Sequence, residues 1–140
     1  MKFLKPTNFS GKRVILRVDF NVPIRDGIIQ STKRIDAAMP TIDLILKNNP
    51  SRLIIISHLG RPNGVTESLS LKPVMEYINT YYHTQVDLCK IENVDNINSK
   101  VILLENIRFH PEETKNLPST NNFRKRLTNL GDIYVNDAFG

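Results

Sequence analysis

The sequence has few of the residues that form disulfide bonds, bind zinc or cross a membrane. Among 140 residues it contains one cysteine, Cys89, and no tryptophan. A single cysteine excludes an internal disulfide bond and any zinc site built from paired cysteines. It also fits a reducing compartment, so we expect a cytoplasmic protein. The longest apolar runs, 53–56 and 101–104, are far shorter than the roughly 20 residues of a membrane-spanning helix, and the N-terminus lacks the apolar stretch of a signal peptide.

Several catalytic and nucleotide-binding motifs are also missing. No stretch matches the phosphate-binding loop G-x-x-x-x-G-K-[ST], the dinucleotide pattern G-x-G-x-x-G or the nucleophile elbow G-x-S-x-G. No pair of histidines and glutamates has the spacing of a metalloprotease. The sequence therefore favours a ligand that is held by charge over one that is attacked by a protein nucleophile.

The charge that is present is mostly positive. Lysine and arginine number 19 against 14 acidic residues, which gives a net charge of +5. This sign favours an anionic partner: nucleic acid, a membrane surface or a phosphorylated metabolite. A nucleic-acid face more often shows a basic stripe with interleaved aromatic residues. The nearest match, residues 123–126, is more typical of a solvated helix surface, so we expect neither nucleic acid nor membrane as partner.

Four apolar, β-branched runs predict strands, at residues 14–20, 53–57, 101–105 and 133–136. Continuous apolar runs are typical of strands that are buried on both faces of a parallel sheet. Helical periodicity lies between them, at residues 34–48, 71–82 and 121–130. Strands that alternate with helices predict an α/β fold, a three-layer Rossmann-like sandwich with a mainly parallel sheet.

Smaller signals refine this prediction. Pro40 either starts the first long helix or kinks a longer one. Ser70 is the predicted cap of the second helix, Ser119 or Thr120 caps the third, and Gly131 ends it. Residues 25–27 predict a turn between two short extended pieces. Residues 91–99, which are polar and rich in asparagine, predict a surface connection.

Polar side chains follow the predicted strands at the points where they end. Asp19 and Asn21 follow the first strand, His58 and Arg61 the second, and Arg108 the third. In open α/β sheets, ligands bind outside the carboxyl ends of the strands. The pattern therefore predicts a pocket for a small polyanion at this edge of the sheet.

Arg34, at the start of the first predicted helix, adds a further cation. Arginine suits such a pocket because its planar fork binds two oxygens and does not titrate. Each residue also has a structural interpretation that the sequence leaves open. Asp19 and Asn21 fit ordinary turns, Arg34 fits a solvated helix face, and His58 and the other arginines fit structural or surface pairs.

Five blocks, in order, resemble the phosphoglycerate kinase family over essentially the whole chain. They are R-V-D-F-N-V-P at 17–23, S-H-L-G-R-P at 57–62, S-L-K-P-V at 70–74, L-E-N-I-R-F-H-P-E-E at 104–113 and G-D-I-Y-V-N-D-A-F-G at 131–140. The resemblance implies a glycolytic enzyme that moves a phosphoryl group reversibly between 1,3-bisphosphoglycerate and ADP, giving 3-phosphoglycerate and ATP. It also implies a monomer.

The resemblance assigns roles to individual residues. It implies that Asp19 and Asn21 bind the glycerate carboxylate and hydroxyl region and that Phe20, between them, is also a substrate-binding residue. It implies that Arg34 is catalytic and bridges the substrate carboxyl oxygen and the transferring phosphoryl group. A fixed cation suits this role because phosphoryl transfer depends on positioning and charge stabilisation.

A second group of residues is assigned to the same substrate. His58, Leu59, Gly60 and Arg61 are implied to contact it, and Arg108 to hold its distal phosphate. The resemblance places no metal ligand and no cofactor-binding residue in this chain. The co-substrates Mg-ATP and Mg-ADP are implied to bind a C-terminal domain that lies outside it.

The family is longer than this chain and has two domains. Residues 1–140 are therefore expected to form part of the N-terminal, glycerate-binding domain, incomplete at its C-terminus and inactive alone. A second hypothesis is a stand-alone, catalytically dead module that binds 3-phosphoglycerate or a partner chain. A third, ranked last, is a basic protein recruited to nucleic acid. An incomplete sheet exposes an edge and apolar faces, so we also expect marginal stability or aggregation.

Overall fold

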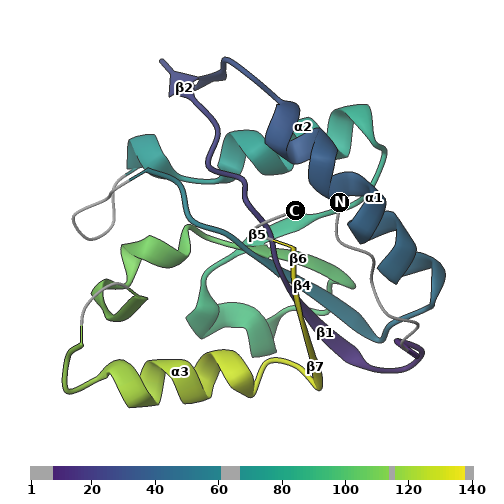
Figure 1. Ribbon diagram of the computed structural model, residues 1–140, viewed down its shortest axis with the longest axis vertical. Helices are drawn as coiled ribbons and strands as arrows, with labels where there is room; N and C mark the ends of the chain where they lie inside the picture. The colour runs from purple at the N-terminus through teal and green to yellow at the C-terminus, as the bar shows by residue number, and fades with distance from the viewer. Residues whose placement is uncertain (1–7, 61–66, 114–115, 138–140) are drawn as a thin grey trace.

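A parallel sheet forms the centre of the protein. The computed structural model describes residues 8–60, 67–113 and 116–137. Its five-stranded sheet has the order β5-β6-β4-β1-β7 (Figure 1). The strands are β1 (Arg13–Arg17), β4 (Arg52–Ile56), β5 (Asp87–Cys89), β6 (Val101–Leu104) and β7 (Ile133–Asn136). Every neighbouring pair in this sheet is parallel, so the predicted α/β fold with a parallel sheet is confirmed.

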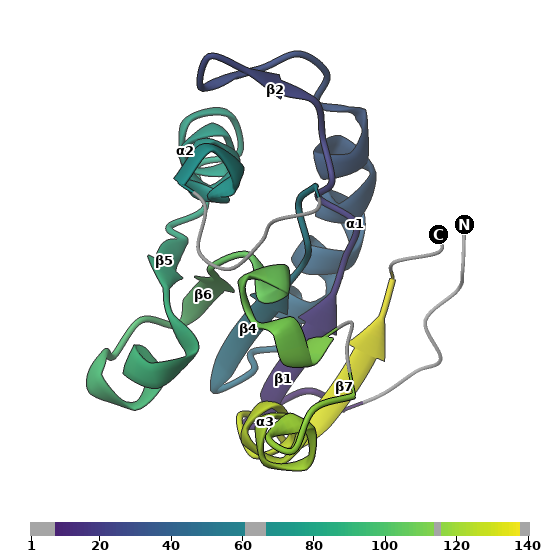
Figure 2. The same cartoon turned by 90° about the vertical axis from the view of Figure 1, so that its left-hand side faces the viewer.

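Helices cover both faces of the sheet. Figure 1 shows α1 (Lys33–Lys47) and α2 (Lys72–Tyr81) on one face. The helix α3 (Thr120–Thr128) and the 3-10 helix η2 (Ile91–Asn96) lie on the other. Figure 2 shows the same arrangement from the side, with the sheet between α2 above and α3 below. The three predicted helices are therefore present, each within two residues of its predicted ends.

Alternation along each strand divides the core between the two faces. Leu16, Leu53 and Leu103 belong to the cluster that packs against α1 and α2. Ile54 and Ile102 belong to the opposite cluster, which contains Val94 of η2 and has Leu127 of α3 packed against it. Because successive side chains point to opposite faces of a strand, an uninterrupted apolar run fills both layers. This is the physical reason why the continuous runs predicted buried parallel strands.

One local prediction is wrong, and one strand was not predicted. Residues 91–99 do not form a purely surface connection, because η2 buries Ile91 and Val94 against the sheet and α3. The short edge strand β5 was not predicted, since Asp87–Cys89 has only three residues and no apolar run. Pro40 lies inside α1 and not at its start.

The predicted turn and caps are present in part. Arg25 and Ile28 pair across the hairpin formed by β2 (Ile24–Arg25) and β3 (Ile28–Ile29). The cap position of α2 is taken by Leu71 and not by the predicted Ser70, whose Oγ still accepts a 3.1 Å hydrogen bond from the Lys72 amide in the first turn. Ser119, at the start of α3, makes no capping bond with its side chain. Within the described ranges, no helix is long and apolar enough to cross a membrane.

Candidate functional site

The sequence-predicted polar residues come together at the carboxyl edge of the sheet. Because β1, β4 and β6 are parallel neighbours, the segments that follow them leave the sheet on the same side. Hydrogen bonds between the side chains and backbone of these segments join residues 19–21, 58–60 and 105–108. Arg34 reaches the same region from the first turn of α1. The predicted site residues that the structure describes therefore lie together in one site.

Arg34 is held against the segment that follows β1. Its Nη1 donates a 2.7 Å hydrogen bond to the carbonyl oxygen of Asn21 and lies 3.4 Å from Oδ1 of Asp19. The same Oδ1 accepts a 3.0 Å bond from the Asn21 amide. The Arg34 side chain remains 53% exposed. The guanidinium group is therefore fixed at one nitrogen while much of it still faces solvent.

The carboxylate of Asp36 anchors the helical turn that carries Arg34. Oδ1 of Asp36 accepts hydrogen bonds from the hydroxyls of Tyr77 (2.8 Å) and Tyr82 (2.6 Å), and Oδ2 accepts one from Thr32 (2.9 Å). The hydrogen bond to Asp36 raises the pKa of Tyr82 to about 12, and that from Tyr82 lowers the pKa of Asp36. These bonds tie the start of α1 to α2.

Gly60 links the segments that follow the three strands. Its amide donates a 2.9 Å hydrogen bond to Oδ1 of Asn21, and its carbonyl oxygen lies 3.4 Å from Nη1 of Arg108. Its φ angle is +62°, and a Cβ at this position would lie 2.9 Å from a methyl carbon of Leu69. Both the backbone conformation and the close contact therefore favour glycine here.

Arg108 carries an unused hydrogen-bond donor. Its Nε is buried and has no hydrogen-bond partner among the residues that the structure describes. Buried polar groups are normally satisfied, and an exception calls for an explanation such as an ion or ligand. An oxyanion would satisfy this donor, because an arginine fork presents Nε and Nη in one plane to two oxygens.

His58 is half-buried beside this arginine. Burial, and then the positive charge of Arg108, lower the pKa of His58 below its ordinary value of 6.5, against opposing effects that include the charge of Asp19. At neutral pH the imidazole is therefore uncharged in the free protein. It can donate one hydrogen bond and accept another, and an anion nearby would favour its protonation.

Three of the predicted site residues need separate comment. The side chains of Phe20 and Leu59 are fully buried in the core that packs against α1 and α2, so only their backbone faces the site. The amide of Phe20 donates to Oγ of Ser57 at 2.9 Å. Arg61 lies outside the described residues. Within the part described, the structure brings the other predicted residues together: Asp19, Asn21, Arg34, His58, Gly60 and Arg108.

Two charged residues of this edge were not singled out in the sequence. Arg17, at the end of β1, forms a 2.8 Å ion pair with Glu113, and the two side chains are 24% and 16% exposed. Both stand inside the sequence blocks at 17–23 and 104–113. Membership of those blocks could have identified them, whereas spacing could not, because 96 residues separate the partners.

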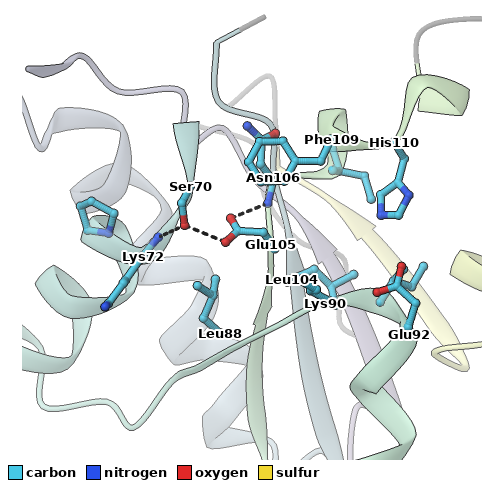
Figure 3. A pocket seen from close by; sticks show the side chains of 13 residues that line it. Ser70, Lys72, Leu88, Lys90, Glu92, Leu104, Glu105, Asn106, Phe109 and His110 are labelled. Carbon is cyan, nitrogen blue, oxygen red and sulfur yellow. Dashed lines mark hydrogen bonds between the residues drawn. The ribbon is translucent and has the colours of Figure 1, made fainter. Parts of the chain in front are cut away.

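A pocket of about 670 Å³ lies at the neighbouring part of the same edge, between the end of β6 and the start of α2 (Figure 3). Glu105 forms hydrogen bonds along one side of it. Its carboxylate accepts bonds from the amides of Leu71 and Asn106 and from the hydroxyl of Ser70. This carboxylate therefore satisfies donors at the start of α2. In the described residues, no group of three or more His, Cys, Asp and Glu side chains could hold a metal ion.

The sequence matches one family over nearly its whole length. The family model described as phosphoglycerate kinase matches residues 4–140. A phosphoglycerate kinase of Tetrahymena thermophila is 42% identical, over 95% of this chain and 37% of that protein. One from Hydrogenobaculum sp. is 45% identical, over 99% of this chain and 36% of that protein. The chain therefore spans a little over a third of these relatives.

Solved structures agree with the sequence comparison. The phosphoglycerate kinase of Coxiella burnetii matches 95% of this chain with a TM-score of 0.80 and 35% identity, which covers 34% of that chain. The enzyme from Pyrococcus horikoshii matches 95% of this chain with a TM-score of 0.78 and 32% identity, which covers 35% of that chain. The resemblance seen in the sequence blocks is confirmed, and the chain belongs to the phosphoglycerate kinase family.

Proposed function

We propose that this chain forms the 3-phosphoglycerate-binding part of a phosphoglycerate kinase. The reaction of the complete enzyme moves a phosphoryl group reversibly between 1,3-bisphosphoglycerate and ADP, giving 3-phosphoglycerate and ATP. Family membership supports the reaction. The cations and donors at the carboxyl edge of the sheet support the choice of ligand, because they suit a small molecule with a phosphate at one end and a carboxyl group at the other.

The unpartnered Nε of Arg108 carries this proposal. A buried guanidinium nitrogen without a partner among the described residues is costly unless a ligand supplies an acceptor. The distal phosphate of 3-phosphoglycerate supplies oxygens that can pair with Nε and an Nη together. His58, next to Arg108, then lies where it can donate a hydrogen bond to the same ligand.

Asp19, Asn21 and Arg34 are proposed to bind the other end of the ligand. The Asp19 carboxylate and the Asn21 amide suit the hydroxyl and carboxyl region. Arg34 is half exposed, and its bonds to the described residues involve Nη1 alone. Its Nε and Nη2 are therefore proposed to donate to the carboxyl oxygen and the transferred phosphoryl group. A fixed cation there would stabilise charge that develops on the equatorial oxygens.

Phosphoryl transfer is proposed to need more protein than this chain. The chain covers 37% of the Tetrahymena relative, and we assign none of its residues to the nucleotide or its magnesium ion. We therefore expect residues 1–140 to bind 3-phosphoglycerate without producing ATP from 1,3-bisphosphoglycerate and ADP.

The test is a titration of the chain with 3-phosphoglycerate, followed by calorimetry and by amide chemical shifts. We expect saturable binding that shifts the amides of Asn21, Gly60 and Arg108. Glycerate, which lacks the phosphate, should bind more weakly. Arg108→Ala should weaken the binding of 3-phosphoglycerate, whereas Arg13→Ala, at the opposite end of β1, serves as the matched control and should not.

Two results would contradict the proposal. One is the absence of saturable 3-phosphoglycerate binding by a folded chain. The other is tighter, salt-sensitive binding to arbitrary duplex DNA, which would indicate a general basic surface. ATP production by the chain alone would overturn only the expectation that transfer needs a further domain.

A further inference from the structure

Asn106 is a fully buried amide at the centre of the candidate site. Its relative exposure is 0%, and its side chain is one of three buried polar ones in the described residues. Oδ1 accepts 3.1 Å hydrogen bonds from the amides of Leu59 and Arg108. Nδ2 donates to the carbonyl oxygens of Leu59 (2.7 Å) and Leu69 (2.9 Å). A carboxamide offers two donors and two acceptor positions, and here all are in use.

These bonds join segments that are far apart in the sequence. Leu59 is bound through both its N–H and its C=O, so the backbone between His58 and Gly60 is fixed in direction. The bond to the Arg108 amide fixes the turn that carries the guanidinium group. The bond to Leu69 holds the residue whose methyl carbon limits the space beside Gly60.

We propose that Asn106 is a positioning residue that sets the relative geometry of His58, Gly60 and Arg108 for the phosphorylated ligand. This rests on the proposed function, in that 3-phosphoglycerate is the ligand whose contacts are positioned. Asn106 itself has no spare donor or acceptor and is buried, so it does not touch the ligand. It acts through the backbone that it holds.

The side-chain bonding of Arg108 supports this assignment. Asn106 binds the backbone of Arg108 and leaves its guanidinium group free of the amide. That group contacts the carbonyl oxygen of Gly60 at 3.4 Å and keeps its Nε without a described partner. The turn that carries the arginine is therefore fixed through its backbone, while its buried Nε has no partner among the described residues that would compete with an oxyanion.

An isosteric change tests the role of the amide. Asn106→Asp keeps the acceptor for Leu59 and Arg108 but replaces the NH₂ group with an oxygen that faces the carbonyl oxygens of Leu59 and Leu69. Acceptors that face one another repel, so the segment 58–60 must shift. Gly60 is the reporter, because its amide bonds to Asn21 and not to Asn106.

Asn79 supplies a matched control. Its Oδ1 accepts a 2.8 Å bond from the Val86 amide and its Nδ2 donates a 3.1 Å bond to the Val86 carbonyl, which is the same two-sided clamp on one residue. It joins α2 to the segment before β5, outside the candidate site. Asn79→Asp therefore imposes the same chemical conflict without displacing residues 58–60.

The experiment measures amide hydrogen exchange and 3-phosphoglycerate affinity in the two variants under conditions in which both are folded. For Asn106→Asp we expect exchange of the Gly60 amide to accelerate about tenfold or more relative to the Ile54 amide in β4, and affinity to fall about tenfold or more. For Asn79→Asp we expect neither change beyond the general loss of stability. If Asn106→Asp matches Asn79→Asp in both readouts, the positioning role is overturned.

Two further measurements test the proposal if the variant does not fold or the chain binds no ligand. If Asn106→Asp does not fold, the unmutated chain is used: saturating 3-phosphoglycerate should slow exchange of the Asn106 side-chain NH₂ more than that of Asn79, and equal slowing overturns the proposal. If the unmutated chain binds no 3-phosphoglycerate, the proposed function fails. The Gly60 exchange in Asn106→Asp still decides whether Asn106 positions the segment, because this readout needs no ligand.

Discussion

The two ends of the sheet use arginine differently. At the amino end, Arg52 begins β4 and directs its three guanidinium nitrogens to the carbonyl oxygens of Val94, Ile97 and Ser99. Arg13 begins β1 and binds both carboxylate oxygens of Asp132 as well as a carbonyl oxygen. At the amino end, both guanidinium groups are therefore satisfied within the chain.

At the carboxyl end, Arg17 is paired with Glu113, but Arg34 and Arg108 are only partly bonded to the described residues. Arg34 has contacts through Nη1. Arg108 reaches one carbonyl oxygen at 3.4 Å and has an Nε without a partner in the described ranges. Arg108 therefore keeps a donor without a partner among the described residues, whereas Arg13 and Arg52 direct all three guanidinium nitrogens to partners. The comparison separates arginines that stabilise the fold from arginines that are placed for a ligand, and the following variants test this separation.

The largest effect is expected for Arg34→Ala in a complete kinase that contains this chain. Loss of a fixed cation at the transferring phosphoryl group should lower kcat about a hundredfold or more, with a modest change in KM. Steady-state kinetics with 3-phosphoglycerate and ATP give both constants. A variant that retains nearly the original kcat would remove Arg34 from the catalytic role, and a loss confined to KM would make it a binding residue only.

A smaller effect is expected for Arg108→Ala. Charge-assisted hydrogen bonds contribute about 1.5–3 kcal/mol, so 3-phosphoglycerate affinity should fall roughly tenfold to a hundredfold by calorimetry. Stability should change little, because the only side-chain hydrogen bond of Arg108 to the described residues is the long one to Gly60. Unchanged affinity, or a large loss of stability, would place this arginine with those of the amino end.

Arg52→Ala should show the opposite pattern. It leaves the carbonyl oxygens of Val94, Ile97 and Ser99 without their partner, so the free energy of unfolding should fall by about 1–3 kcal/mol. Chemical denaturation measures this loss. The affinity for 3-phosphoglycerate should stay the same under conditions in which the variant is folded. A change of affinity without a change of stability would break the distinction between the two ends.

The smallest expected effect concerns the titration of His58. Burial and the charge of Arg108 lower its pKa below 6.5 in the folded chain. The unfolded chain thus binds the proton more tightly. This contribution to stability is present above pH 6.5 and is lost as the pH falls through the folded-state pKa.

Removing the neighbouring cation tests this account. In Arg108→Ala the pKa of His58, followed by its ring proton resonances, should move upward toward 6.5, because Arg108 is the second largest cause of the lowering. Arg13→Ala should leave it in place. Bound 3-phosphoglycerate should also raise it, since an anion favours the imidazolium form. If the pKa of His58 is the same in Arg108→Ala, in Arg13→Ala and in the ligand-bound protein, then the charge of Arg108 does not lower it.

Much of the fold could be predicted from the sequence. Uninterrupted apolar runs such as 53–56 can be buried only between two layers, and the helical period between them supplies those layers. The elements that were missed lack such a pattern. β5 has three residues, and the burial of Ile91 and Val94 in a polar segment depends on contacts with the far side of the sheet. Such contacts cannot be predicted from the composition of the segment itself.

The candidate site, like the fold, was predictable only in part from the sequence. The sequence by itself determined which polar residues follow each strand, because strand ends are set by the local apolar pattern, and its motif blocks indicated the family. Only the tertiary structure decided which donors are already used. The pairing of Arg17 with Glu113 and the clamp made by Asn106 depend on partners that the sequence keeps far apart. The Nε of Arg108, which has no partner among the described residues, is buried only by the fold. Hydrogen bonds are satisfied in space, so a residue's role as a structural or a ligand-binding group is settled only when its neighbours are in place.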